Sequence, residues 1–174
     1  VSLAGALDLQ NNLSASVAQG KSLEFRGPVT VSSNTSLALS GSASFHQDSS
    51  LTLNANLSTS IAQGSLLDLS ASLSGNGSLS KSGSGTLLLS RDNSSFSGNT
   101  SLQDGHLRVG HSSALGSGSL SIQGGQFSVT SQDVSISNSV SLSGIATLGS
   151  SGDSHPLSFS GSASSFASSL SLAS

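Results

Sequence analysis

Apolar residues in this chain recur as doublets that bracket a single residue. The clearest series is Leu67/Leu69, Leu87/Leu89 and Leu107/Val109. Successive doublets are 20 residues apart, because 87 − 67 = 20 and 107 − 87 = 20. A period of two is typical of a β-strand with one buried face. The pattern therefore predicts strands with these apolar side chains inward and with Asp68, Leu88 and Arg108 outward.

Looser copies of the doublet occupy the rest of the chain. They are Leu23/Phe25, Val29/Val31, Leu37/Leu39, Leu51/Leu53, Leu120/Ile122, Phe127/Val129, Val134/Ile136, Val140/Leu142, Leu157/Phe159 and Leu170/Leu172. Glycine-containing turns separate many of them, and no apolar series keeps the i, i+3, i+4, i+7 spacing of an amphipathic helix. The sequence therefore predicts an all-β protein.

An internal copy sets the long period of the chain. Residues 12–25 (NLSASVAQGKSLEF) match residues 56–69 (NLSTSIAQGSLLDL) at an offset of 56 − 12 = 44, or two turns of 22. Periods of this length are typical of solenoids, in which each repeat buries its apolar face against its neighbours. We expect residues 1–174 to form one segment of parallel β-helix with coils of about 20 residues. A β-sandwich is the structural alternative, although sandwich strands usually carry more aromatic residues and no near-exact copies.

Composition separates this chain from ordinary enzymes and from disordered proteins. Roughly three residues in ten are Ser, well above the ordinary share, and only 7% are charged. Ser- and Gly-rich chains often stay disordered because they bury too little apolar surface. Here the hydrophobic third is placed in alternation and the mean hydropathy is +0.10, which favours strands over coil.

Charge and cysteine content exclude further classes. The net charge is −3, and the five basic residues are spread without clustering: Lys21, Arg26, Lys81, Arg91 and Arg108. A surface for nucleic acid or an anionic membrane needs a basic stripe and usually stacking aromatic residues. The absence of Cys excludes disulfides and Cys-based zinc sites. With no initiator Met, leader pattern or long apolar run, we expect a piece of a longer polypeptide whose targeting segments lie elsewhere.

Three groups of residues resemble parts of a hydrolase, a metal site or a glycosidase site, and for each group a purely structural role is the simpler interpretation. Gly152-Asp153-Ser154 resembles the start of a serine hydrolase motif, but His155 is adjacent in sequence and no later carboxylate exists, so a turn is expected. His106, His111 and Asp104 lack a fourth ligand at a known zinc spacing. Glycoside hydrolysis requires two carboxylates at a fixed separation. Asp48 and Asp68 are 20 residues apart, so stacking of the coils could bring them together. Without Trp or Tyr to form a sugar platform, we expect these acids on a solvated face.

We therefore expect no catalytic, cofactor-binding or metal-binding residues, no cofactor, no nucleic-acid partner and no small-molecule substrate. Six Asn-x-Ser/Thr sequons follow from the richness in Ser and Asn: Asn12, Asn34, Asn56, Asn76, Asn93 and Asn99. They do not indicate glycosylation by themselves.

The order of these motifs resembles a known family. Residues 57–129 are similar to the autotransporter-associated β-strand repeat, also called the passenger-associated transport repeat, of bacterial type V secreted surface proteins. The matching pieces are Lys81-Ser82-Gly83-Ser84-Gly85-Thr86-Leu87, Phe96-Ser97-Gly98, Gly105-His106-Leu107-Arg108-Val109 and Ala114-Leu115-Gly116-Ser117-Gly118. A partial copy lies at residues 17–20. Phe96 replaces the Tyr common in the family, and Arg91-Asp92 stands where the family tends to have Gly and a small residue.

The resemblance implies a right-handed parallel β-helix in the passenger domain of an autotransporter. It implies export through a C-terminal outer-membrane β-barrel on the same full-length chain, and display on the cell surface. The expected function is that of a noncatalytic stalk that supports an adhesin, with a host-cell or matrix ligand as a further partner. The alternatives are direct adhesion to host cells, sister cells or glycans, and a polysaccharide-active enzyme.

Overall fold

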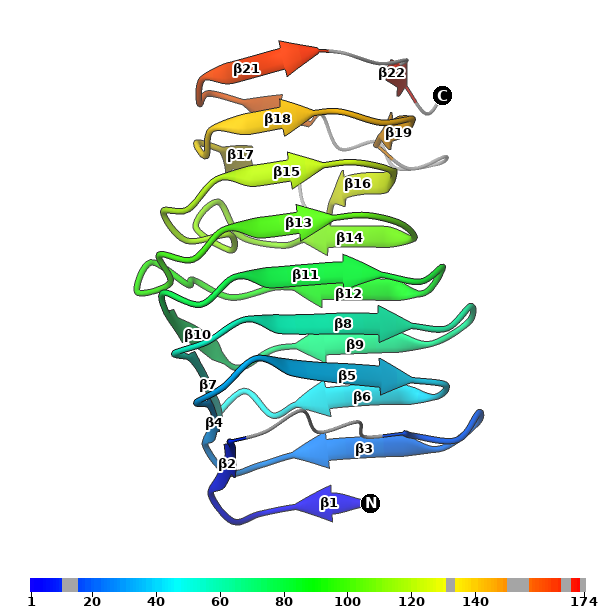
Figure 1. Ribbon diagram of the computed structural model, residues 1–174, viewed down its shortest axis with the longest axis vertical. Helices are drawn as coiled ribbons and strands as arrows, with labels where there is room; N and C mark the ends of the chain where they lie inside the picture. Colours follow the sequence, from blue (N-terminus) through cyan, green and yellow to red (C-terminus); the bar gives the residue numbers. More distant parts are fainter. Residues whose placement is uncertain (11–15, 131–133, 150–156, 167–169, 173–174) are drawn as a thin grey trace.

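The chain folds as a β-solenoid of stacked parallel coils. The computed structural model describes residues 1–10, 16–130, 134–149, 157–166 and 170–172. Within these residues there is no helix, and every paired strand is parallel to its partner. The parallel β-helix predicted from the doublets is therefore confirmed, and the sandwich alternative is wrong. The coils rise from the N-terminal strand in the right-handed sense (Figure 1).

Three sheets form the walls of the solenoid. The nine strands of sheet A are β1 (Ser2–Leu3), β3 (Ser22–Phe25), β6 (Ser42–Phe45), β9 (Leu66–Leu69), β12 (Thr86–Leu89), β14 (His106–Val109), β16 (Gly125–Val129), β19 (Ala146–Leu148) and β22 (Leu170–Leu172). The seven strands of sheet C are β5 (Thr35–Leu39), β8 (Leu57–Ile61), β11 (Leu79–Ser82), β13 (Thr100–Leu102), β15 (Leu120–Ile122), β18 (Val140–Leu142) and β21 (Ala163–Phe166). Figure 1 shows sheet C in front of sheet A, with strands running in opposite directions on the two walls.

The third wall changes along the molecule. Its first part is sheet B, formed by β2 (Leu7–Leu9), β4 (Val29–Val31), β7 (Ser50–Leu53) and β10 (Ser72–Gly75). Beyond β10 it continues as a single bridge between Gly75 and Phe96. Nearer the C-terminus, β17 (Ser135–Ile136) pairs with β20 (Ser158–Phe159). Loops with buried Phe96, Ala114 and Leu115 close this wall where strands are missing.

The register of sheet A is the one that the doublets predict. Leu87 pairs with Leu67 on one side and with Leu107 on the other, and all three are fully buried. The outward row places Leu88 between Asp68 and Arg108. Each of the looser doublets also overlaps a strand, from β3 to β22. The core is one continuous cluster of Leu, Val, Ile, Ala and Phe that runs through the stack.

Coil length is less uniform than the internal copy suggests. In sheet A, Leu23 pairs with Ala43, and Ala43 pairs with Leu67, so the 44-residue offset there is 20 followed by 24 (43 − 23; 67 − 43). Over these coils, sheets B and C keep the predicted spacing of 22 (51 − 29; 57 − 35). Corner loops absorb the difference while the strands stay in register. Glycine lets the corners approach closely, because a Cβ on Gly98 would collide with the carbonyl oxygen of Gly77.

Candidate functional site

The three side chains considered for a metal do not converge. His106 Nε2 lies 2.7 Å from Ser128 Oγ, and His111 Nδ1 accepts a hydrogen bond from its own loop at Ser113 N. The Asp104 carboxylate accepts from the backbone N–H of Gly105. Among the described residues, no group of three or more His, Asp or Glu side chains could hold a metal ion.

The two acids considered for hydrolysis are not neighbours in the stack. Asp68 lies opposite Ser44 in β6 and Leu88 in β12, whereas Asp48 is in the turn after β6, 3.4 Å from His46. The reason is the 24-residue coil between β6 and β9, which breaks the 20-residue spacing at this point. The stretch from Gly152 to His155 lies outside the described residues.

A buried lysine is the most unusual polar group in the core. Lys81 occupies an inward position of β11 and is 0% exposed. Its ammonium donates to the carbonyl oxygens of Ser82 (2.8 Å), Gly83 (2.5 Å) and Asp104 (3.1 Å). Three donors thus meet three acceptors from two successive corners. Burial lowers the pKa of Lys81 to about 8, against the opposing effect of the Asp104 charge.

Glycine makes room for this ammonium. A Cβ on Gly105 would lie 2.6 Å from Lys81 Nζ, and Gly105 has a φ of +73°, which side-chain-bearing residues rarely adopt. The Lys81 stem stacks between Thr59 and Leu102 in the inward row of sheet C. The arrangement joins one corner to the next, because the Nζ donors of Lys81 are directed at three backbone carbonyl oxygens.

Asparagine side chains connect coils in the interior. Asn93 is 1% exposed; its Oδ1 accepts from Leu73 N at 2.9 Å and its Nδ2 donates to Ala114 O at 2.8 Å. Asn138 Nδ2 donates to the carbonyl oxygens of Gly116 and Gly118. These bonds satisfy backbone groups in the third wall, where few ladder bonds exist.

A second asparagine ladder lies at the exposed corner before sheet C. Asn34 Oδ1 accepts from Asn56 N at 3.1 Å, and Asn56 Oδ1 accepts from Ser78 N at 3.0 Å. One coil further, Asn99 Oδ1 accepts from Ser119 N at 3.0 Å. Several of the sequons therefore mark this corner. The recurrence of Asn at 56 − 34 = 22 was the sequence signal that could have identified it.

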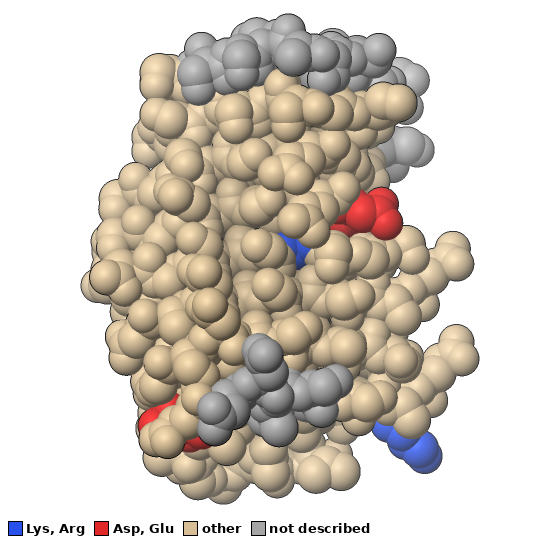
Figure 2. All heavy atoms as spheres, viewed as in Figure 1, with Lys and Arg blue, Asp and Glu red and all other residues tan. Residues whose placement is uncertain are grey.

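The outer face of sheet C is a ladder of hydroxyl groups. The outward row consists of Ser36, Ser58, Ser80, Ser101, Ser121 and Ser141, paired in register from strand to strand. Neighbouring hydroxyl positions are about 4.8 Å apart along the rod. Charged atoms occupy only a few small spots on this side of the molecule (Figure 2). The face can offer many hydrogen bonds and very little electrostatic attraction.

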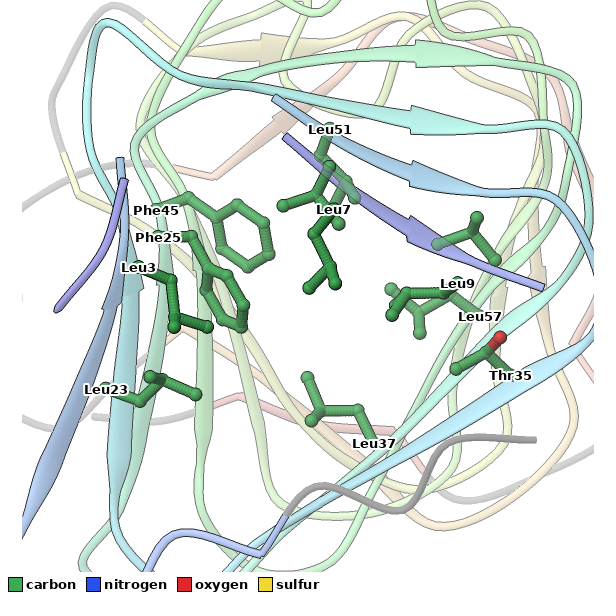
Figure 3. Close-up of a pocket in the computed structure, with 12 residues that line it drawn as sticks. Leu3, Leu7, Leu9, Leu23, Phe25, Thr35, Leu37, Phe45, Leu51 and Leu57 are labelled. Atoms are coloured by element: carbon green, nitrogen blue, oxygen red, sulfur yellow. The ribbon is translucent and has the colours of Figure 1, made fainter. Parts of the chain in front are cut away.

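The N-terminal end of the core forms an apolar cavity of about 90 Å³. Figure 3 shows Leu7, Leu9, Leu37 and the stacked rings of Phe25 and Phe45 pointing into it from different walls. All but one of its lining residues are hydrophobic. Leu3 remains 41% exposed at this end, so the first coil packs less completely than the interior coils.

No protein-family model, curated protein or solved structure matches this chain. The described residues contain no helix that is long and apolar enough to cross a membrane.

Proposed function

We propose that this chain is a noncatalytic stalk segment of the passenger domain of a bacterial autotransporter. The observation that carries the proposal is the unbroken parallel stacking of sheet A, in which each strand from β1 to β22 pairs with the next coil. Such a stack extends in one direction and holds its two ends at a fixed separation. The Lys81 and asparagine contacts add coil-to-coil links in the same direction.

The order of motifs in residues 57–129 supports the autotransporter assignment. In that assignment the segment reaches the cell surface through a C-terminal outer-membrane β-barrel on the same full-length chain. The lack of Cys suits passage of an unfolded chain, because a disulfide formed before export would obstruct threading. Low charge and few aromatic residues suit the same route.

The export route is tested on cells that make the full-length protein. An antibody against this segment should label intact cells, and added protease should remove that signal without lysing them. A periplasmic marker protein serves as the control that the outer membrane stayed closed. Labelling that appears only after the outer membrane is opened would contradict surface display.

Direct adhesion is the second candidate, favoured by the serine row of sheet C. A flat, nearly uncharged hydroxyl face can hydrogen-bond to a neutral glycan along its length. The stalk and the adhesin are separated by applying the purified segment to host cells, sister cells and immobilised glycans. A pure stalk binds none of them. Binding that is lost when Ser58, Ser80 and Ser101 are together changed to Lys would favour adhesion.

A further inference from the structure

On the outer face of sheet A, the Arg108 guanidinium makes no ion pair with any acidic residue that the structure describes. Its neighbours in the outward row are the apolar Leu88 and the hydroxyl of Ser128. In the described part of the chain, the ion pairs are Arg26 with Glu24 and His46 with Asp48. The Nε atom of Arg108 is buried and has no hydrogen-bond partner.

An unpaired buried donor of this kind is unfavourable. Leaving a buried N–H unsatisfied costs about 1–3 kcal/mol, and more when the group is charged. Arginine N–H groups form a planar fork that matches a carboxylate, sulfate or phosphate in two parallel hydrogen bonds. The nearest acid in the same row, Asp68, is two coils away, and its carboxylate already accepts from Ser70 at 2.7 Å.

Ser128 and His106 supply further polar groups beside the guanidinium. Ser128 is the register partner of Arg108 on the next strand, and His106 lies two residues before Arg108 on the same outward face. His106 Nε2 and Ser128 Oγ are 2.7 Å apart, which fixes the hydroxyl next to the guanidinium. When the imidazole N–H donates to Ser128 Oγ, the hydroxyl proton is left to donate to a ligand.

We propose that Arg108, Ser128 and His106 form a binding site for a single oxyanion. The guanidinium fork holds two oxygens, the Ser128 hydroxyl donates to one of them, and His106 orients that hydroxyl. The ligand class is a carboxylate, sulfate or phosphate group, either as the free ion or carried by an acidic sugar. This site lies on the side wall of the solenoid, so it goes beyond the stalk function and does not depend on it.

The test is a titration of the whole chain with sodium sulfate, sodium phosphate and sodium glucuronate, followed by NMR. Glucose and sodium chloride are the controls for the neutral sugar and for ionic strength. We expect saturable shifts at the Arg108 Nε–H and at the His106 ring with the oxyanions, and none with either control. Tighter binding of glucuronate indicates an acidic sugar, whereas tighter binding of sulfate or phosphate indicates the free ion or an ester.

Arg108→Gln should weaken oxyanion binding at least about tenfold, because the charge and the fork are both lost. Arg108→Lys keeps the charge without the fork and should bind with intermediate affinity, and it serves if the Gln variant fails to fold. Arg91→Gln removes an exposed arginine from the loop after β12 and is the matched control. No saturable binding of any oxyanion, or equal binding by the Arg108 variants and wild type, would overturn the proposal.

Discussion

At the scale of single residues, Lys81 and Asn93 are polar residues inside the solenoid whose side-chain hydrogen bonds are complete. The Lys81 ammonium has three donors and meets three carbonyl oxygens, and Asn93 uses both ends of its amide. Most buried polar groups in proteins are satisfied in this way, because an unsatisfied one costs free energy. These residues therefore specify which coil corners meet, because their hydrogen bonds are directional whereas the contacts between the aliphatic side chains of the core are not.

The pKa of Lys81 predicts an unusual dependence of stability on pH. Below pH 8 the amine is charged in both the folded and the unfolded chain. Between about 8 and the ordinary 10.5 the unfolded chain binds the extra proton, so the free energy of unfolding rises with pH. Relative to Lys81→Met, wild type should gain up to about 3 kcal/mol across this window.

Urea unfolding at a series of pH values measures this difference. Lys21→Met, a change at an exposed lysine in the corner before β3, controls for the general effect of losing one positive charge. Parallel stability curves for wild type and Lys81→Met from pH 8 to 10.5 would show that the ammonium is not desolvated as described.

Removing the interior amide should be costly. Asn93→Ala leaves Leu73 N and Ala114 O without partners in the closed wall, and we expect a loss of about 2–4 kcal/mol in the free energy of unfolding. Asn76→Ala, at an exposed position 17 residues earlier (93 − 76 = 17), should change it by less than about 0.5 kcal/mol. Thermal or urea unfolding compares the two. Equal losses would mean that the Asn93 bonds contribute nothing specific.

At the scale of the strand, the alternation of inward and outward positions governs tolerance to charge. Leu87→Asp places a carboxylate in a fully buried row between Leu67 and Leu107 and should unfold the adjacent coils. Asp68→Ser changes an outward position and should have little effect. Hydrogen exchange along β9, β12 and β14 reports the difference directly. Similar tolerance at both positions is incompatible with this register.

Strands were predictable from sequence wherever two apolar residues bracket a third, because that pattern alone fixes which face is buried. The doublet pattern did not predict strand β11, because its inward positions are occupied by Leu79 and Lys81 rather than by two apolar residues. A lysine in a strand normally indicates a face exposed to solvent. Lys81 can point inward because its ammonium donates to a corner carbonyl oxygen of the neighbouring coil, which the sequence alone does not reveal.

Sites formed between coils were harder to predict than strands. The 20-residue spacing of Asp48 and Asp68 suggested a pair, but the coil between β6 and β9 is longer. Conversely, the outward Leu88 and Arg108 were predicted, whereas the contact of His106 with Ser128 was not. That contact is diagonal across two strands, and a diagonal depends on side-chain direction, which the residue spacing alone does not specify.

At the scale of the whole molecule, stability should build up from neighbouring coils. Each coil contacts only the coils above and below it, and the backbone ladder and the core run continuously through the stack. In the isolated segment, the coil at the N-terminal end has one such neighbour and borders the cavity lined by Leu7 and Leu9. Its hydrogen exchange should be faster than that of the interior coils for this reason.

Because each coil contacts only its two neighbours, we predict that one whole coil can be removed without unfolding the rest. Leu87 stands opposite Leu67 in the register, so deleting residues 67–86 joins Leu66 to Leu87 and places each later strand one level down (87 − 67 = 20). All three walls lose one level together. The shortened chain should keep its β-sheet circular dichroism and its cooperative melting, and X-ray scattering should show a rod shorter by about 4.8 Å.

Deleting only residues 77–86 is the matched control. This change removes β11 together with Thr86, the first residue of β12, and connects β10 to the rest of β12, so one wall loses a level while the others do not. Because strand pairing and core packing are then out of step in every later coil, we expect loss of cooperative melting and aggregation through unpaired edges. If the 20-residue and the ten-residue deletions unfold alike, the coils are not interchangeable units. The molecule would then depend on particular long-range contacts, and its use as a spacer of adjustable length would lose its physical basis.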